Sequence, residues 1–543
     1  MLEKLLPLYE NEMKALEHDM TLLAQQHPES MATLKFDNSN SASLVTQLIQ
    51  SIAFISARTQ AQFDDSQNKI MHSLLRLLTP HLEYPTPSYS IIQFKPRKSA
   101  DHSLEIPRLT RLIVQNERHE AYEFRTAYAT QIQNIELTEI KLAKHSLKLK
   151  LKAHADYLEE LNLRFYLNAN LEDSLVIQNL IFTQLRDIDL EIGGSLHKIS
   201  LEQLRTLGLE DSEGLLDHPK TILKIHRILQ EFFNYPHKFL FFEIKIPPFH
   251  IHKNLCFNLT FNFDREISHL EKLIHQESFK LNCCPIINLY SQLAEPIKID
   301  PSRKHYEFLI NQSTTTKQNI YRITQIQGIT EAGISTDYFP VFYNDFKQKT
   351  KELNYWELDR QENGALLLKI EQAVNNNDKF LSGELLVCDN IVAKSSPNTE
   401  SKILFKDKQY PPIEKLEFIL EPSLFLASKL NHNSFSSIIQ QLKTHYQAHQ
   451  QEFSLENLLS LFRVYNPEKY SAINQLINAI EELSTTYGWH LESNGAFSKI
   501  KVLTLILNKP AENYYYLLYK IIELIAHDYS DILCKTELKI KIQ

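Results

Sequence analysis

Glycine is scarce in this sequence: 10 of its 543 residues are glycine, about a quarter of the usual share of roughly 7%. The first is Gly193, so the first third of the chain cannot contain a glycine-built phosphate loop. GxGxxG, GxxxxGK, HExxH and GxSxG are absent from the whole sequence. These absences exclude the commonest nucleotide-binding, zinc-protease and serine-hydrolase motifs.

Cysteine and long apolar runs are also rare. No apolar run approaches the ~20 residues that span a bilayer, and the N-terminus lacks the basic region and cleavage site of a signal peptide. The cysteines are odd in number, and no CxxC spacing occurs. Dispersed thiols suit a reducing compartment, so we expect a cytoplasmic protein, not inserted in a membrane, with mostly buried free thiols. The cysteines are Cys256, Cys283, Cys284, Cys388 and Cys534.

The charge balance is mildly acidic, with 58 Lys plus Arg, 66 Asp plus Glu and a net charge of −8. A protein that grips nucleic acid through its phosphates is expected to be basic, so we expect no nucleic-acid partner. The most basic segment follows a proline-rich turn and lacks interleaved aromatic residues, which favours a solvated loop over a polyanion site. Its basic residues are Lys95, Arg97, Lys98, Arg108 and Arg111.

Few local patterns suggest a metal or catalytic site. His250 and His252 would share one face of a strand, but no cysteine or acidic cluster adjoins them. Asp64 and Asp65 are adjacent, and adjacent residues of a helix do not face each other, so they fit a helix cap. Gly193-Gly194 fits a turn. We therefore expect no metal, no cofactor and no catalytic residue from these motifs.

The pattern of apolar residues predicts a multidomain α+β protein. It has a helical N-terminal segment, β-rich middle domains and a mixed α/β C-terminal region. Proline-rich turns at 85–87 and 411–412, and a change of pattern near 235, mark the boundaries. The predicted domains are 1–85 (helical, for assembly), 86–235 (first β-rich), 236–410 (second β-rich) and 411–543 (mixed).

The N-terminal segment contains a heptad seam that ends at Pro28. A second helix, with Leu44, Leu48, Ile52 and Ile55 on one face, follows a turn at 37–41, and a third is expected to begin at a cap at 64–66. The seam packs either on these helices or on another subunit, and the sequence leaves both possibilities open. Its residues are Leu6, Tyr9, Met13, Leu16, Met20 and Leu23.

Period-two alternation dominates the middle of the chain and predicts strands at 147–152 and 255–263, with an Asn363-Gly364 hairpin near 355–370. A helical interlude is expected around 201–233. Polar loops are expected at 375–378 and 395–400. Towards the C-terminus the pattern predicts helices at 435–446, 455–465, 470–487 and 514–529, and strands at 500–507 and 538–542.

The N-terminal motifs are similar to those of the TssF (ImpG, VasA) family of type VI secretion baseplate subunits. They comprise an AFLAAR-like helix, an acidic pair, a leucine-rich helix ending in Pro-His and a PTPS turn, with Ser56 in place of an alanine. These motifs fall in Leu5–Glu12, Leu48–Arg58, Phe63–Asp65, Leu74–His81 and Pro85–Ser88.

Later fragments follow in the family's order. One resembles its FPEKFLFF strand with His237 in place of an acid, two resemble its TPVVNLF and AEPI segments, and one resembles its closing FLFGKVIE helix. The glycine-rich turn expected near the C-terminus is missing at 495–499. The fragments are Tyr235–Phe242, Pro285–Tyr290, Ala294–Ile297, Tyr306 and Leu517–Glu523.

The resemblance implies a structural wedge subunit of a contractile injection machine, and not an enzyme. Family members pair as two copies around one TssG subunit, join TssK and TssE, and form six wedges around the spike beneath a contractile sheath. It implies contacts with neighbouring wedges and a spike or hub protein, on the cytoplasmic face of the inner-membrane secretion complex. The seam from Leu6 to Leu23 would then contribute to subunit bundles.

Two alternatives stay open on the sequence alone. The first is a hydrolase-like cytoplasmic enzyme whose site is built from distant residues, which predicts a deep pocket with perturbed titratable groups. The second is a baseplate protein of a related injection system with different partners.

Overall fold

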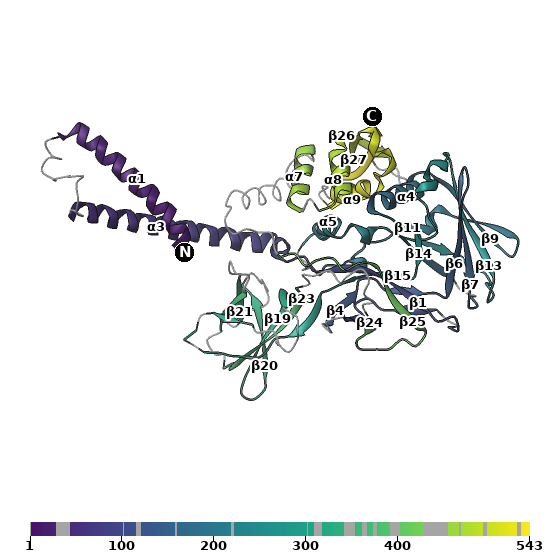
Figure 1. Cartoon of the computed structure of the whole chain (residues 1–543), viewed down its shortest axis with the longest axis horizontal. Helices are drawn as coiled ribbons and strands as arrows, with labels where there is room; N and C mark the ends of the chain where they lie inside the picture. Colours follow the sequence, from purple (N-terminus) through teal and green to yellow (C-terminus); the bar gives the residue numbers. More distant parts are fainter. Residues whose placement is uncertain are drawn as a thin grey trace. The chain divides into compact units, whose positions relative to one another are not determined.

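A computed structural model gives the fold of the chain (Figure 1). It describes residues 2–28, 44–100, 103–115, 121–157, 160–218, 222–300, 302–303, 305–308, 318–341, 353–360, 366–372, 377–390, 402–427, 454–465, 469–491, 497–528 and 534–543. The predicted turn at 37–41, loop at 395–400, helix at 435–446 and hairpin turn at 363–364 lie outside these residues, as does the first half of the loop at 375–378. The fold class is confirmed: helices at the N-terminus, sheets in the middle, and both at the C-terminus.

Two long helices form one compact unit, and a second unit begins at His81 and contains the sheets. The helices are α1 (Leu2–Gln26) and α3 (Leu44–Leu78), which run antiparallel (Figure 1). The predicted cap at 64–66 is wrong, because α3 continues through it; its sequence contains neither proline nor glycine to interrupt it. Pro7 lies inside α1, in its second turn.

A six-stranded and a five-stranded sheet account for many strands of the second unit. The predicted alternation is confirmed in the five-stranded sheet, where Leu149 and Leu259 face inward as neighbours across two strands. Gly193 and Gly194 form the turn between two of its strands, both with positive φ, as a tight hairpin requires. The six-stranded order is β24 (Lys402–Phe405), β3 (Arg111–Gln115), β4 (Ala121–Thr126), β15 (Cys283–Ile287), β1 (Tyr89–Pro96), β25 (Ile413–Leu420). The five-stranded order is β10 (Ser195–Ile199), β9 (Leu185–Ile192), β13 (Cys256–Phe263), β7 (Ser146–Ala153), β6 (Ile135–Leu142).

The remaining sheets of this unit are smaller or lie later in the chain. The predicted pairing of the strands near 355–370 is confirmed, because β21 and β22 are antiparallel neighbours. The four-stranded order is β11 (Leu204–Thr206), β12 (Phe241–Ile246), β8 (Leu161–Leu167), β14 (Phe279–Leu281), and β2 (Leu104–Ile106) pairs with β5 (Thr130–Ile132). The eight-stranded sheet holds β16 (Tyr290–Leu293), β23 (Phe380–Asp389), β19 (Gln318–Ile329), β20 (Ser335–Pro340), β21 (Asn354–Arg360), β22 (Leu366–Glu371), β18 (Tyr306–Glu307) and β17 (Ile297–Lys298) beside β23.

Helices and 3-10 turns lie between these strands. The predicted interlude at 201–233 is helical only in its last part, α5 (Lys224–Asn234). Before it come η2 (Leu201–Gln203), β11 and η3 (Asp211–Glu213). Helix α4 (Leu171–Thr183) was not predicted, although Asn170 caps it by accepting from the Asp173 N–H at 2.8 Å. The other 3-10 turns here are η1 (Pro80–Glu83), η4 (Pro236–Phe239) and η5 (Ser268–Lys272).

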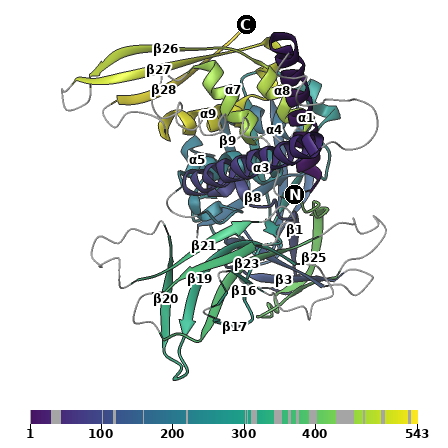
Figure 2. The same cartoon turned by 90° about the vertical axis from the view of Figure 1, so that its left-hand side faces the viewer.

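The C-terminal region combines helices with a three-stranded sheet, β26 (Ile480–Leu491), β27 (Phe497–Leu507) and β28 (Cys534–Ile542), labelled in Figure 2. The predicted helix 455–465 is α7 (Leu455–Tyr465). The predicted helix 470–487 is wrong beyond α8 (Ser471–Asn478), because the β-branched Thr485 and Thr486 favour a strand and pair with β27. The last helix is α9 (Tyr516–Asp528), preceded by η7 (Lys509–Asn513).

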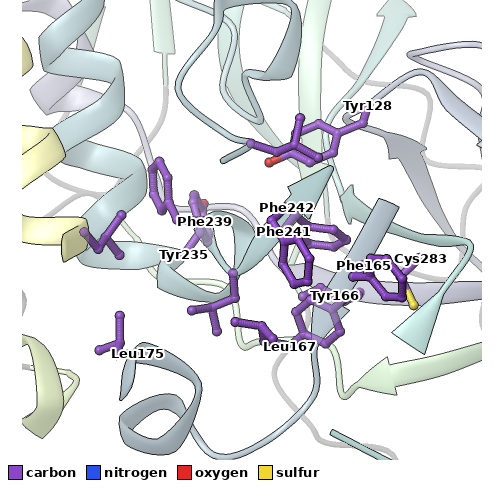
Figure 3. Close-up of a cluster of buried hydrophobic side chains, with 14 of the residues drawn as sticks. Tyr128, Phe165, Tyr166, Leu167, Leu175, Tyr235, Phe239, Phe241, Phe242 and Cys283 are labelled. Carbon is purple, nitrogen blue, oxygen red and sulfur yellow. The ribbon is translucent and has the colours of Figure 1, made fainter. Parts of the chain in front are cut away.

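Aromatic side chains form the centre of the larger core (Figure 3). The Phe165 and Phe242 rings stack with centroids 5.2 Å apart, and Tyr166 lies 4.8 Å from Phe241. These residues come from β8 and β12, so the core joins adjacent strands of one sheet. The segment that resembles the FPEKFLFF strand supplies Phe241 and Phe242 of this core. It includes the η4 turn and continues into β12. A second, smaller cluster of buried side chains lies within residues 290–387. The domain limits at 85, 235 and 410 stay predictions.

Candidate assembly interface

The contact between α1 and α3 uses small residues on the α3 side. Ala53 and Ala57 are completely buried, one helical turn apart, and Ile49, Ser56 and Ala61 are half-buried beside them. Small side chains at this spacing let two helix backbones approach closely. The AFLAAR-like motif of the sequence therefore forms the contact surface of the helical pair.

The six seam residues are divided between contact and solvent. Tyr9, Met13, Leu16 and Met20 are half-buried. Leu6 and Leu23 are exposed, at 59% and 50%. The structure thus places both ends of the seam in solvent and its middle partly against the chain.

Large apolar side chains of α3 lie outside the contact with α1. We call Leu48, Ile52, Ile55 and Phe63 the α3 stripe; their exposed fractions are 58%, 53%, 63% and 60%. At 100° per residue, the mean direction of the stripe lies roughly 140° around the helix from that of the buried alanines. Phe54, 45% exposed, lies on the opposite flank of those alanines.

Covering the exposed side chains of the α3 stripe would release a substantial free energy of burial. Burying one such side chain completely is worth about 1.5–3 kcal/mol, so the half-exposed stripe corresponds to roughly 5 kcal/mol as an upper bound. An apolar surface of this kind on two flanks of a helix pair is typical of helices that join a larger bundle.

Some of the other residues singled out in the sequence form ion pairs or ring contacts within the chain. The basic segment is partly neutralised, since Lys95 pairs with Glu417 at 2.5 Å and Arg111 pairs with Glu123. The rings of His250 and His252 lie 3.7 Å apart, and His252 Nδ1 is 4.0 Å from Asp156. Among the described residues, no group of three or more His, Cys, Asp or Glu could hold a metal ion.

Two further expectations concern the thiols and the membrane. Cys283, Cys284 and Cys388 are free and buried, as expected, whereas Cys256 is free and exposed. Within the described residues, no helix is both long and apolar enough to cross a membrane.

A buried ion network that no sequence motif predicted surrounds Glu231 of α5. Glu231 accepts from the N–H groups of Leu215 and Leu216 at 2.8 and 2.9 Å and pairs with Arg227 at 3.0 Å and with Lys238. Burial alone would raise the pKa of Glu231, but Lys238 and Arg227 hold it below its usual value. Burial lowers the pKa of Lys238 to about 8, against the attraction of Glu231. The sequence held one sign of this network: Lys238 stands within the aromatic run Tyr235–Phe242, where a charged side chain needs a buried partner.

A histidine cluster joins three helical elements. The Tyr465 hydroxyl of α7 lies 2.8 Å from His81 Nε2 of η1 and 2.7 Å from His226 Nδ1 of α5. The ring of His218 lies 5.3 Å from that of His81, and its Nε2 is 2.9 Å from the Gln230 side-chain oxygen. Burial lowers the pKa of His218 to about 4. Both networks fasten α5 to its surroundings.

Comparison with known proteins gives one consistent result. The family model "Type VI secretion system, TssF" matches residues 1–542. The chain is 21% identical to the type VI secretion system component TssF1 of Pseudomonas aeruginosa, over 89% of this chain and 86% of that protein.

Two solved structures share the fold. One is a chain of the TssK-TssF-TssG baseplate subcomplex of the type VI secretion system, with a TM-score of 0.75 and 16% identity over 92% of this chain and 96% of that chain. The other comes from the baseplate complex of the type VI secretion system, with a TM-score of 0.59 and 16% identity over 99% and 97%. With the family model matching almost every residue, this chain belongs to the type VI secretion system TssF family.

Proposed function

We propose that this chain is a structural wedge subunit of a type VI secretion baseplate, without catalytic activity or cofactor. The observation that carries the proposal is the helical pair, which exposes large apolar side chains on both sides of a contact made by alanines. Such a pair is incomplete as a folded unit and becomes complete as part of a bundle.

The proposed occupant of the bundle is a TssG-like subunit, with two copies of this chain for each TssG. The solved structure with the higher TM-score is a TssK-TssF-TssG subcomplex, which supports TssG-like and TssK-like proteins as partners. TssE-like subunits, neighbouring wedges and a spike or hub protein complete the proposed set. The complex would assemble in the cytoplasm, at the cytoplasmic face of the inner-membrane secretion complex.

Within the chain, we assign the bundle contact to the α3 stripe and to the seam residues Leu6, Tyr9, Met13, Leu16, Met20 and Leu23. Leu6 and Leu23 extend the exposed apolar surface onto α1. The β-rich modules would form the arms that touch adjacent wedges.

The test is native mass spectrometry of the full chain co-expressed with a TssG-like protein of the same organism. We expect a stable complex with two copies of this chain per partner. Ile52→Lys together with Ile55→Lys should abolish the complex while the chain stays folded, because both side chains are largely exposed. Gln50→Lys, at an exposed polar position of the same helix, is the matched control and should leave the complex intact.

The seam is tested by Met13→Glu with Leu16→Glu. Loss of the complex with an unchanged circular dichroism spectrum would support a shared seam. Loss of the fold would instead favour packing within the chain, since both residues are half-buried. A monomer that ignores the TssG-like partner would contradict the wedge assignment.

A further inference from the structure

Three arginines of the second unit lie near one another, and one of them pairs with a carboxylate. Arg322 of β19 donates from Nη2 to Asp217 at 2.9 Å. Arg108 donates to the carbonyl oxygens of Ala127 at 3.0 Å and Gly214 at 2.7 Å, which orients its guanidinium without neutralising it. Arg125 of β4 lies near enough to all of these charges that Asp217, Arg108 and Arg322 each affect its pKa.

Arg125 is the least compensated of the three. Its Nε is buried and donates to no atom of the described residues. Arg111 lies directly opposite it on β3, and like charges at opposed positions of antiparallel strands destabilise a sheet. Burial, together with the neighbouring arginines, lowers the pKa of Arg125 to about 10.

The acidic groups nearby are already paired. Glu123 pairs with Arg111 and with Lys406 at 2.5 Å, and Glu231 pairs with Arg227 and Lys238. Among the described residues Arg322 pairs with Asp217, whereas Arg108 and Arg125 form no ion pair, which leaves a surplus of two positive charges at a partly exposed position.

An exposed leucine adjoins this surplus. Leu109 has φ of 66°, a left-handed conformation that is unusual for a leucine, and it is 48% exposed. Its N–H donates to the Thr126 carbonyl at 2.9 Å, and the Thr110 N–H donates to the Thr126 hydroxyl at 3.0 Å. These hydrogen bonds fix the turn that contains Leu109 to the end of β4, so the exposed Leu109 side chain lies next to Arg108 in the chain. Strain retained at such a position is a common mark of a binding site.

We propose that Arg108, Arg125 and Arg322 bind the carboxylate of an acidic side chain on another protein, and that an apolar neighbour of that acid packs on Leu109. Guanidinium forks match a carboxylate through two parallel hydrogen bonds. The ligand is a protein segment and not a nucleic acid, since the chain as a whole carries a charge of −8. The identity of the partner as a baseplate subunit rests on the proposed function, whereas the anion site does not.

The site is tested first with citrate, which carries three carboxylates, against sodium chloride at equal ionic strength. Citrate should raise the Tm of the full chain by a few degrees and saturate. Arg125→Gln should remove this response, and without citrate it should raise the Tm, because a buried surplus charge is gone. Arg186→Gln, at an exposed arginine that pairs with Asp187, is the matched control and should respond as the wild type does. An Arg125→Gln chain that still responds fully to citrate overturns the site.

The partner is tested by photo-cross-linking. A benzophenone amino acid replaces Leu109, and the complex with the TssG-like and TssK-like proteins is irradiated. The cross-linked peptide should contain Asp or Glu next to an apolar residue. Arg125→Gln should lower the yield roughly tenfold, the loss expected for one charge-assisted pair, and Arg186→Gln should not. A citrate response without an acidic cross-linked peptide means that a small free anion binds, which overturns the protein partner. If no complex forms by native mass spectrometry, the wedge assignment fails, and the citrate result still decides the site.

Discussion

The two units of this chain distribute apolar and charged side chains in opposite ways. In the helical pair the buried contact consists of alanines, while Ile52, Ile55 and Phe63 are exposed. In the β-rich unit the aromatic side chains of the core, such as Phe165 and Phe242, are buried, and so are charges such as Glu231 and Lys238. The β-rich unit packs its core within the chain, whereas we expect a partner to cover the exposed apolar side chains of the helical pair. Burial within the chain therefore indicates stability, whereas exposed apolar surface indicates assembly.

The largest effect is expected from breaking the buried ion network of the β-rich unit. Lys238→Ala leaves Glu231 with a buried charge that has lost its closest partner, and removing one member of a buried pair costs about 3–5 kcal/mol. Urea unfolding should show this loss of stability. Lys148→Ala removes an exposed pair with Glu191 and should cost at most about 1 kcal/mol. Equal losses in the two variants would mean that the buried network stabilises no more than a surface pair.

The histidine cluster should make the same unit sensitive to acid. The unfolded chain takes up a proton on His218 below about pH 6.5, whereas the folded chain does so only near pH 4. Stability is therefore complete above about pH 6.5 and falls as the pH drops towards 4, by at most about 3 kcal/mol for this residue. The urea midpoint measured between pH 7.5 and 4.5 should fall accordingly. His218→Gln should flatten that dependence, and an unchanged pH profile would contradict the assignment.

The helical pair should respond to an oversized residue at its alanine contact. Ala57 is completely buried, so Ala57→Leu pushes α1 away and should cost about 1–3 kcal/mol. Hydrogen exchange of peptides from α1 and α3 should become faster, while that of the β-rich unit should not change. Ser51→Leu, at an exposed position of α3, serves as the control and should leave the exchange of both helices unchanged.

The sequence predicted secondary structure best where the structure of a segment depends only on its own residues. The bounds of α7 and the inward face of β13 follow directly from apolar spacing. The strand β26 was mistaken for a helix because its structure depends on pairing with β27, a contact between separate segments. The charges around Glu231 were missed for the same reason, since Lys238 and Leu215 meet it only in the folded chain. In the helical pair, spacing identified the apolar residues but could not decide which of them would face solvent.

The smallest predicted effect concerns the one departure from the family motif within the helical contact. Ser56 is half-buried beside Ala57, where the family has a small alanine. Alanine has the higher helix propensity, by about 0.5 kcal/mol, and it removes a hydroxyl from a contact made by small apolar groups. Ser56→Ala should therefore stabilise the helical pair slightly, seen as slower hydrogen exchange in α3, with no change in binding of the TssG-like partner. Faster exchange would mean that the serine hydroxyl is itself engaged in the contact, and that the departure from the motif is stabilising in this chain.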